Sequence, residues 1–320
     1  MRRLLLFGAL LVPLSGDAVT IDWVSVGDPG NAPDTASNCV NSAADCGSVA
    51  YSYQISKYEI TNAQYAEFLN AKAASDPYSL YDPNMGNVIA QTGSDGSYSY
   101  AVTAGYEAKP VGYITFFDAL RFANWLNNGQ ASGATETGAY PLQGGTPVPS
   151  NGATVTRNGG AITFLPSENE WYKAAYYSPG GVYFDYPTGS DTPPTCAFPP
   201  TATPNTANCP TGGPNHGPSN VGGYTGSASP YGTFDQAANA AEWNETIAPI
   251  GLRGIRGGCY DCFGGQDAAS PYADDPSKTY PDTGFRVAMV PEPDAGLSGL
   301  LAMTGLLGLA TSRRRHPRRV

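Results

Sequence analysis

Two cysteines separated by two residues are the residues of this chain whose type and spacing point most directly to chemistry. Cys259 and Cys262 lie in the segment Arg256-Gly257-Gly258-Cys259-Tyr260-Asp261-Cys262. Such a pair can be a structural disulfide, a redox-active dithiol, or a soft site in which two thiolates bind Cu(I). No lysine or helix N-terminus is predicted beside it to lower a thiol pKa, so we favour the disulfide and keep the other two interpretations open.

The other four cysteines fall into two local pairs. Cys39 and Cys46 share one loop, and Cys196 and Cys209 share another. In an oxidising compartment, a bridge within each loop is the simplest connectivity.

The scarcity of histidine excludes several common kinds of active site. The chain has two histidines, His216 and His316, and the second lies in the C-terminal tail. A Ser-His-Asp triad and a histidine-rich zinc or iron site are therefore excluded. The glycine-rich stretches also lack the Lys-Ser/Thr ending of a phosphate-binding loop.

Three helices are expected to position these residues. Thr61 is the predicted N-cap of the first, and the second is expected over about 117–127. The third follows a capping box formed by Ser167 and Glu170. Strands are expected near 21–26 and 51–55, and 39 Gly and 28 Pro indicate long loops, notably 129–160 and 187–230. This pattern predicts one large, irregular, loop-rich α+β domain.

The two ends of the chain carry targeting patterns. Arg2 and Arg3 precede an apolar run that is too short to span a bilayer, which predicts a signal peptide over residues 1–18. Residues 290–320 contain a Pro-Glu-Pro motif, an uncharged stretch from Ala295 to Thr311 and a terminal arginine cluster. This tail resembles the PEP-CTERM sorting signal, which implies an exosortase-type sorting enzyme as a partner and a membrane-spanning helix before processing; the alternative is a permanent anchor. The domain at 19–289 is therefore expected outside the cytoplasm, in the cell envelope or on the surface.

Removing these ends makes the remaining chain strongly acidic. Between Val19 and Val290 there are ten Lys and Arg against 24 Asp and Glu, a net charge of about −14. Nucleic acid is excluded as a partner, because phosphate binding needs a basic surface. Excess carboxylate on an exported protein suits hard cations such as calcium.

Six ordered sequence blocks across residues 20–290 resemble the formylglycine-generating enzyme, or sulfatase-modifying factor, family. The resemblance implies a variant of the C-type-lectin-like fold. It also implies that most of the aromatic residues in the blocks are scaffold, and we expect Arg286 to be a buried partner of a carboxylate. The blocks are Tyr58-Glu59-Ile60-Thr61-Asn62, Lys109-Pro110-Val111 with Phe117-Asp118-Ala119 and Ala123-Asn124-Trp125, Leu165-Pro166-Ser167-Glu168-Asn169-Glu170-Trp171, Asn239-Ala240-Ala241-Glu242-Trp243, Arg256-Gly257-Gly258, and Gly284-Phe285-Arg286-Val287-Ala288.

The resemblance also implies a structural calcium site in the loop from Asp235 to Glu242, which leads into the fourth block. The side chains of Asp235 and Glu242 and the carbonyls of Ala238 and Ala240 would bind the ion. Two carboxylates and two carbonyls make a suitable oxygen cage. The alternative is that Asp235 caps a turn and Glu242 pairs with an arginine. The family's second calcium site cannot be placed in this sequence.

The reactive segment departs from the family pattern. In formylglycine-generating enzymes a serine follows the two glycines, and two cysteines five residues apart hold Cu(I). Here Cys259 replaces the serine, Cys262 falls on the first cysteine position, and Asp267 falls on the second. The basic residues expected downstream are also absent.

These departures lead to two main hypotheses for the function, and a third rests on the fold alone. We favour a calcium-stabilised surface or binding module that holds a peptide or glycan near Cys259, Tyr260 and the long loops. The alternative is a copper- and oxygen-dependent oxidase of protein cysteine that acts through Cys259 and Cys262. Generic carbohydrate binding through a lectin-like fold is a third interpretation.

Overall fold

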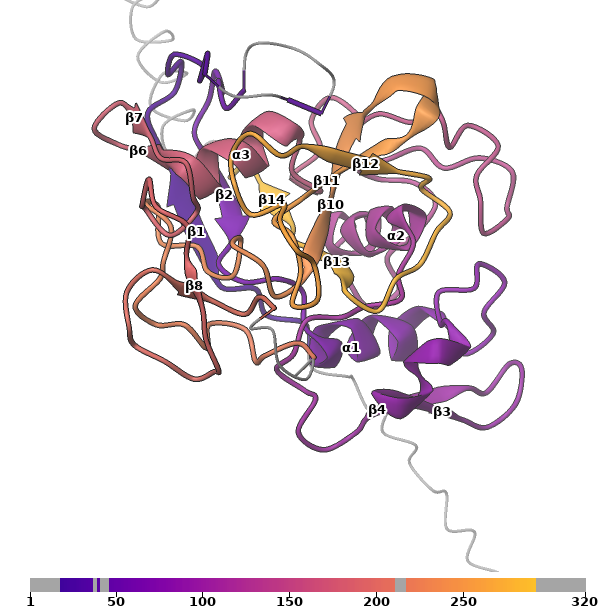
Figure 1. The fold of residues 1–320 in the computed structure, drawn as a ribbon. Helices are drawn as coiled ribbons and strands as arrows, with labels where there is room; N and C mark the ends of the chain where they lie inside the picture. The colour runs from indigo at the N-terminus through magenta and orange to yellow at the C-terminus, as the bar shows by residue number, and fades with distance from the viewer. Residues whose placement is uncertain (1–17, 37–38, 41–45, 211–216, 292–320) are drawn as a thin grey trace, which may run out of the picture.

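The computed structural model describes residues 18–36, 39–40, 46–210 and 217–291 (Figure 1). The predicted signal peptide and nearly all of the predicted sorting tail lie outside these residues. Among the helices of the described ranges, none is long and apolar enough to cross a membrane.

The described residues form three α-helices, as the sequence predicts, and each begins at a side-chain cap. They are α1 (Asn62–Lys72), α2 (Phe116–Asn127) and α3 (Glu168–Tyr176), with N-caps Thr61, Thr115 and Ser167. In each, the cap side chain accepts from the third helical amide, and the side chain of that third residue accepts from the cap's own amide. These reciprocal bonds satisfy amides that a helix start otherwise leaves without partners. The expected capping box of Ser167 and Glu170 is confirmed.

Two four-stranded sheets pack around the helices. The first has the order β1 (Trp23–Val26), β2 (Tyr53–Ser56), β14 (Ala288–Met289), β5 (Thr163–Phe164). The second has the order β12 (Tyr272–Asp274), β11 (Arg253–Arg256), β10 (Ala241–Ile247), β13 (Thr283–Phe285). The expected strands at 21–26 and 51–55 are confirmed as β1 and β2, with bounds shifted by one or two residues.

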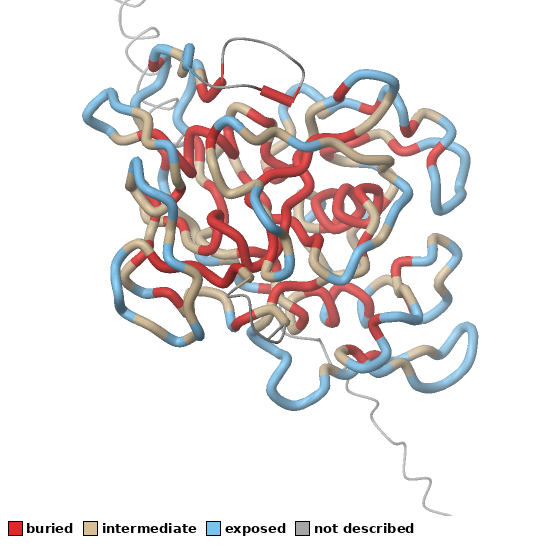
Figure 2. The backbone as a smooth tube through the Cα atoms, in the orientation of Figure 1, coloured by how far each residue is buried: buried red, intermediate tan, exposed pale blue. Residues whose placement is uncertain are grey.

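The remaining elements are short and lie near the surface. They are η1 (Pro83–Asn87), η2 (Pro249–Gly251) and the two-stranded ribbons β3 (Ile89–Thr92) with β4 (Ser99–Val102), β6 (Tyr177–Ser178) with β7 (Val182–Tyr183), and β8 (Thr195–Cys196) with β9 (Thr206–Ala207). Long irregular segments connect them, and buried residues concentrate in α2, α3 and the two larger sheets (Figure 2).

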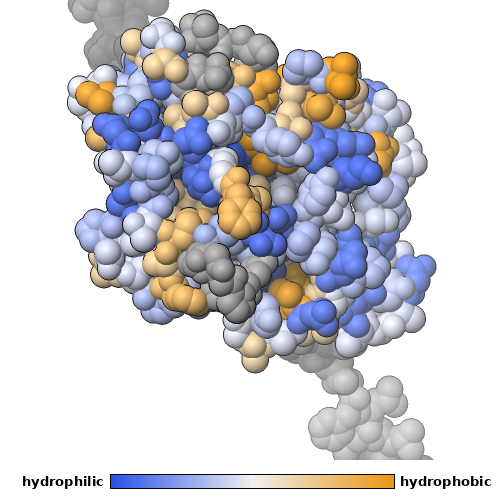
Figure 3. All heavy atoms as spheres, in the orientation of Figure 1, coloured by the Kyte–Doolittle hydropathy of each residue, from blue (hydrophilic) through white to orange (hydrophobic). Residues whose placement is uncertain are grey.

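Aromatic side chains from distant segments form the core. Phe122 of α2 lies with its ring centroid 5.3 Å from that of Phe68 of α1 and 5.3 Å from that of Phe285 of β13. Trp243 of β10 packs edge-on against Phe116. The aromatic residues of the sequence blocks are therefore scaffold, as expected. The side of the molecule seen in Figure 3 is mostly hydrophilic, with separate hydrophobic groups.

Buried ion pairs tie the second sheet to its surroundings. Arg286 donates two hydrogen bonds of 2.6 Å to Glu242, and both side chains have no exposed surface. Arg256 pairs with Glu168 at the start of α3 at 2.7 Å. The expected carboxylate partner of Arg286 is therefore confirmed.

Candidate functional site

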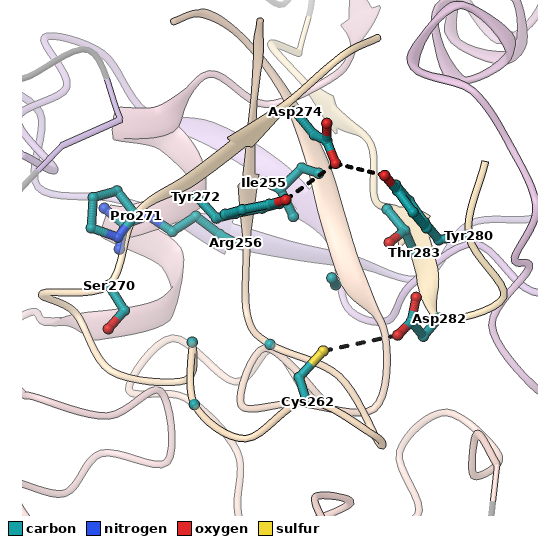
Figure 4. Close-up of a pocket in the computed structure, with 14 residues that line it drawn as sticks. Ile255, Arg256, Cys262, Ser270, Pro271, Tyr272, Asp274, Tyr280, Asp282 and Thr283 are labelled. Carbon is teal, nitrogen blue, oxygen red and sulfur yellow. Dashed lines mark hydrogen bonds between the residues drawn. The ribbon is translucent and has the colours of Figure 1, made fainter. Parts of the chain in front are cut away.

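A cavity of about 430 Å³ opens beside the Cys-X-X-Cys segment. Its walls come from β11, β12, β13 and the loop that follows Cys262 (Figure 4). Two carboxylates and two tyrosines line it, Asp274 and Asp282 with Tyr272 and Tyr280. Arg256 also lines it, but this guanidinium is paired with Glu168 at 2.7 Å, so the wall keeps the negative charge of its two carboxylates. Among the described residues, none of the long loops 129–160 and 187–230 lines the cavity.

The two tyrosines are held by one carboxylate. The hydroxyl groups of Tyr272 and Tyr280 both donate to Oδ2 of Asp274, at 3.2 and 2.9 Å. This contact is the largest cause of the raised pKa of Tyr280, about 12, because ionising the phenol would place two negative charges together. Tyr272 is 58% exposed, so its ring is available to a ligand.

Cys259 and Cys262 are joined by a disulfide in the structure. Cys259 is buried, whereas Cys262 is partly exposed and lines the cavity. The Cys262 amide donates to the Cys259 carbonyl at 3.2 Å, which closes the turn. Of the three interpretations of this pair, a disulfide, a free dithiol and a Cu(I) site, the structure has the disulfide. The local bridges Cys39–Cys46 and Cys196–Cys209 are also present, as predicted.

A carboxylate contacts both sulfurs of this disulfide. Oδ2 of Asp282 lies 3.0 Å from Sγ of Cys259 and 3.9 Å from Sγ of Cys262. The three groups place a ligand atom each within 4.8 Å of one another. Burial raises the pKa of Asp282 above its ordinary range.

Parallel pairing of β10 with β13 brings Asp282 to this position. Ala241 pairs with Thr283, and its amide donates to the Asp282 carbonyl at 2.8 Å. The preceding block thereby fixes the aspartate next to the cysteine turn. Sequence reasoning missed Asp282. Its position depends on the pairing of β10 with β13, and no local signal connects these two strands, which are about forty residues apart in the chain.

Asp267, which stands at the family's second cysteine position, caps a turn. Its Oδ2 accepts from the Ser270 hydroxyl at 2.9 Å, and its carbonyl accepts from the Ser270 amide. Its role in the described structure is therefore local and structural.

Three of the four predicted calcium residues, Asp235, Ala238 and Ala240, lie in the turn before β10, and the fourth, Glu242, is the second residue of β10. Asp235, Ala238 and Asn239 all have positive φ, between 63° and 87°, a conformation that costs free energy in residues other than glycine. Oδ2 of Asp235 accepts from the Gly222 amide at 2.6 Å. Among the described residues, no hydrogen bond reaches the Ala238 or Ala240 carbonyl oxygen. The carbonyl oxygens of Ala238 and Ala240 and the carboxylate of Asp235 can therefore each accept a further hydrogen bond or a metal ion.

Glu242 has close partners of its own. Besides Arg286, its Oε2 accepts from Trp171 Nε1 at 2.7 Å. The arginine pairing that was the alternative for Glu242 is thus present, although a carboxylate oxygen can still accept a further ligand.

A third buried carboxylate, Glu59, adjoins this turn. It accepts from the Ala240 amide at 3.1 Å and from the Asn239 side chain. Burial and then repulsion from Asp235 and Glu242 raise the pKa of Glu59 well above its usual range, and burial raises that of Asp235 to about 6. Of these three buried carboxylates, Glu242 is bonded to the Arg286 guanidinium, whose charge also lowers the pKa of Glu59 and of Asp235. A calcium ion fits the charge and the donor types of this turn.

The chain is similar to known proteins over nearly all of its described length. The family model described as Sulfatase-modifying factor enzyme 1-like domain matches residues 26–290. No curated protein sequence matched the chain. Among solved structures, one titled Crystal Structure of CarF aligns with a TM-score of 0.59 and 22% identity over 85% of this chain and 99% of that one. Treponema denticola variable protein 1 aligns with a TM-score of 0.50 and 15% identity over 84% and 95%. At these identities the structural matches indicate the fold alone.

Proposed function

The chain belongs to the sulfatase-modifying factor enzyme 1-like domain family, and we propose that it is an exported, calcium-stabilised binding module of that family. The observation that carries this proposal is at Asp267. The family's second copper-binding cysteine is replaced by an aspartate that caps a turn, and the Cys262 thiol is bonded to Cys259. The scaffold is retained while the pair of free thiolates is not.

The cavity supplies the proposed binding surface. Its tyrosines and carboxylates can accept hydrogen bonds from a peptide or glycan and stack against it. We therefore propose a ligand position beside Cys262, Tyr272 and Asp274, instead of the position near Tyr260 and the long loops that the sequence suggests.

A screen of peptide and glycan arrays with the purified domain tests the binding function. A ligand of this cavity should lose at least tenfold in affinity in Tyr272→Ala. Val182→Ala, which removes an equally exposed side chain elsewhere, should bind as the wild type does. Conversion of a cysteine in a sulfatase peptide to formylglycine by the purified protein would overturn the proposal.

Calcium is proposed to neutralise the carboxylates around the turn before β10. Asp235, Glu242 and the carbonyls of Ala238 and Ala240 would hold it. Added calcium should then raise the unfolding temperature of chelator-treated protein, and Asp235→Asn should reduce that rise. Equal unfolding temperatures with calcium and with chelator would contradict the site.

The oxidase remains the second candidate, because a specific cluster supports it. Two sulfurs and a carboxylate oxygen lie within 4.8 Å of one another, and reduction would convert the sulfurs into soft ligands suited to Cu(I). Copper retained by the reduced protein, and lost in Cys262→Ser, would favour this candidate. Absence of retained copper would eliminate it.

Export and processing are proposed from the terminal sequences alone. The signal peptide would be removed near residue 18, and an exosortase-type enzyme would cleave near the Pro-Glu-Pro motif. The intact mass of protein recovered from the cell envelope tests both cleavages. A mass that includes the arginine cluster would indicate a permanent anchor instead.

A further inference from the structure

The three disulfides of the described structure differ in their surroundings. Cys262 lines the cavity, whereas no cysteine of the other two bridges lines it. An incoming thiol therefore has an approach to Cys262 through an existing opening. Cys259, which is fully buried, can be reached only through its partner.

The Cys259–Cys262 bridge also contributes least to chain restraint. It spans a sequence separation of 3, against 7 for Cys39–Cys46 and 13 for Cys196–Cys209. The stabilisation expected from loop closure grows with loop length. Stabilising the fold is consequently a weaker explanation for this bridge than for the other two.

The contact with Asp282 provides a partner for the reduced state. A disulfide sulfur carries no hydrogen, but a Cys259 thiol would donate to Oδ2 of Asp282 at the observed 3.0 Å separation. At the Cys196–Cys209 bridge, Sγ of Cys209 instead lies 3.9 Å from the main-chain carbonyl oxygen of Ala207. The closed turn between Cys259 and Cys262 would keep the two thiols adjacent, so that the bridge can form again.

We propose that Cys259 and Cys262 form a thiol–disulfide exchange site, in which a cysteine thiol entering the cavity attacks Cys262. This inference is independent of the proposed binding function. The acidic cavity lowers the local concentration of anionic thiols, which favours a neutral or basic peptide cysteine over glutathione.

The exchange balances in two steps. A substrate thiolate attacks Sγ of Cys262, the bond between Cys262 and Cys259 breaks, and Cys259 leaves as a thiolate and takes up a proton. A second substrate thiolate then attacks the substrate sulfur of the mixed disulfide and releases Cys262. Two substrate thiols are oxidised to a disulfide, and the protein disulfide is reduced by the same two electrons.

The wild-type protein allows the first test without any mutation. The oxidised protein is equilibrated with buffers of varied glutathione ratio, quenched, alkylated and analysed by peptide mass spectrometry. Cys259–Cys262 should become reduced at ratios that leave Cys39–Cys46 and Cys196–Cys209 oxidised and the fold intact. Reduction of all three bridges together, only as the protein unfolds, would overturn the proposal.

Single-cysteine variants identify the sulfur that is attacked. In Cys259→Ser, Cys262 should form a mixed disulfide with oxidised glutathione at least tenfold faster than Cys259 does in Cys262→Ser. Equal rates would show that Cys262 is not the point of entry. The same reaction is then repeated with a neutral, disulfide-linked cysteine peptide in place of oxidised glutathione. A peptide reaction faster than that of glutathione would identify a peptide cysteine as the substrate, whereas a slower one would identify a small thiol and contradict the preference for a peptide.

Asp282 is proposed as a positioning residue, and its role has a separate readout. In Asp282→Ala the reduced Cys259 thiol loses its acceptor, which should shift the equilibrium with glutathione about fivefold toward the disulfide. Asp261→Ala is the matched control, because this exposed carboxylate lies between the cysteines, without a recorded contact to either sulfur. Equal shifts in the two variants would refute the role of Asp282, while leaving the first test of the exchange itself unaffected.

Discussion

Replacing Arg286 with methionine is the sharpest test of how the centre of this domain is stabilised. The guanidinium donates two hydrogen bonds to Glu242 and one each to the carbonyls of Ser56 and Phe234, at 3.0 Å. It thus connects β10, β2 and the segment before the turn at residues 235–240. In Arg286→Met, Glu242 stays buried and loses its cation.

The expected cost is large because the pair has no access to solvent. Removing one partner of a buried ion pair costs about 3–5 kcal/mol, since a charge is left buried without compensation. The charge of the same guanidinium also lowers the pKa of two further buried carboxyl groups, those of Glu59 and Asp235. For a domain of this size the loss corresponds to a decrease of roughly 10 °C in unfolding temperature.

The cost should also depend on pH. Arg286 lowers the pKa values of Glu59 and Asp235, so its removal raises them further above their unfolded values. A carboxyl with a raised folded pKa binds its proton more tightly in the folded state, and stability then falls as pH rises from the unfolded pKa through the folded one. The variant should therefore be closer to the wild type at pH 5 than at pH 8.

Thermal and urea unfolding in chelator, at pH 5 and pH 8, measure both effects. Lys72→Met is the control, because the Lys72 ammonium is at the surface and donates only to the Ser132 carbonyl, at 3.4 Å; a change within about 0.5 kcal/mol is expected. A loss below about 1 kcal/mol for Arg286→Met at pH 8, or a loss that is larger at pH 5, would refute this account of the cluster.

Two further predictions concern a close backbone contact and a loop disulfide. A Cβ at Gly112 would lie 2.3 Å from the Pro281 carbonyl oxygen, so Gly112→Ala should displace the segment that carries Asp282, just before β13, and cost about 1–3 kcal/mol in urea unfolding. Gly159→Ala, where nothing lies within 4 Å, should cost under about 1 kcal/mol, and similar costs for both variants would contradict the clash. Replacing Cys196 and Cys209 together with serine should lower stability by about 3 kcal/mol, because the bridge closes a separation of 13 residues. Unchanged thermal unfolding in that variant would show that this loop is restrained by other contacts.

Much of the scaffold could be predicted because its signals are local. Thr61 and Ser167 cap helices through bonds that reach only three residues along the chain. The loop cysteines bridge to near neighbours, and the aromatic spacing of the helices predicts which faces are buried. The fold itself could be predicted only from the family resemblance of the six blocks. The chain is too rich in loops for a periodic pattern of apolar residues to indicate it.

The candidate site was predicted only in part, because its partners come from separate segments. Cys259 and Cys262 are visible as a motif, and Asp235 and Glu242 follow from the family resemblance. The acidic cavity, with Asp274 and the tyrosines, required the observed pairing of β11 with β12. Glu59 belongs to the first family block, yet nothing in that block indicates that its side chain contacts the turn at residues 235–240.

The sequence by itself determined the three helices and the caps of two of them, the two loop disulfides, the family and the altered reactive segment. Each depends on residues that are neighbours in the chain or on an ordered set of such blocks. Only the tertiary structure decided that Asp282 contacts both sulfurs, that Arg286 neutralises Glu242, and that Cys262 alone of the pair lines the cavity. These arrangements depend on the register of strands far apart in the sequence, and that register is fixed by the packing of the whole core rather than by any one segment.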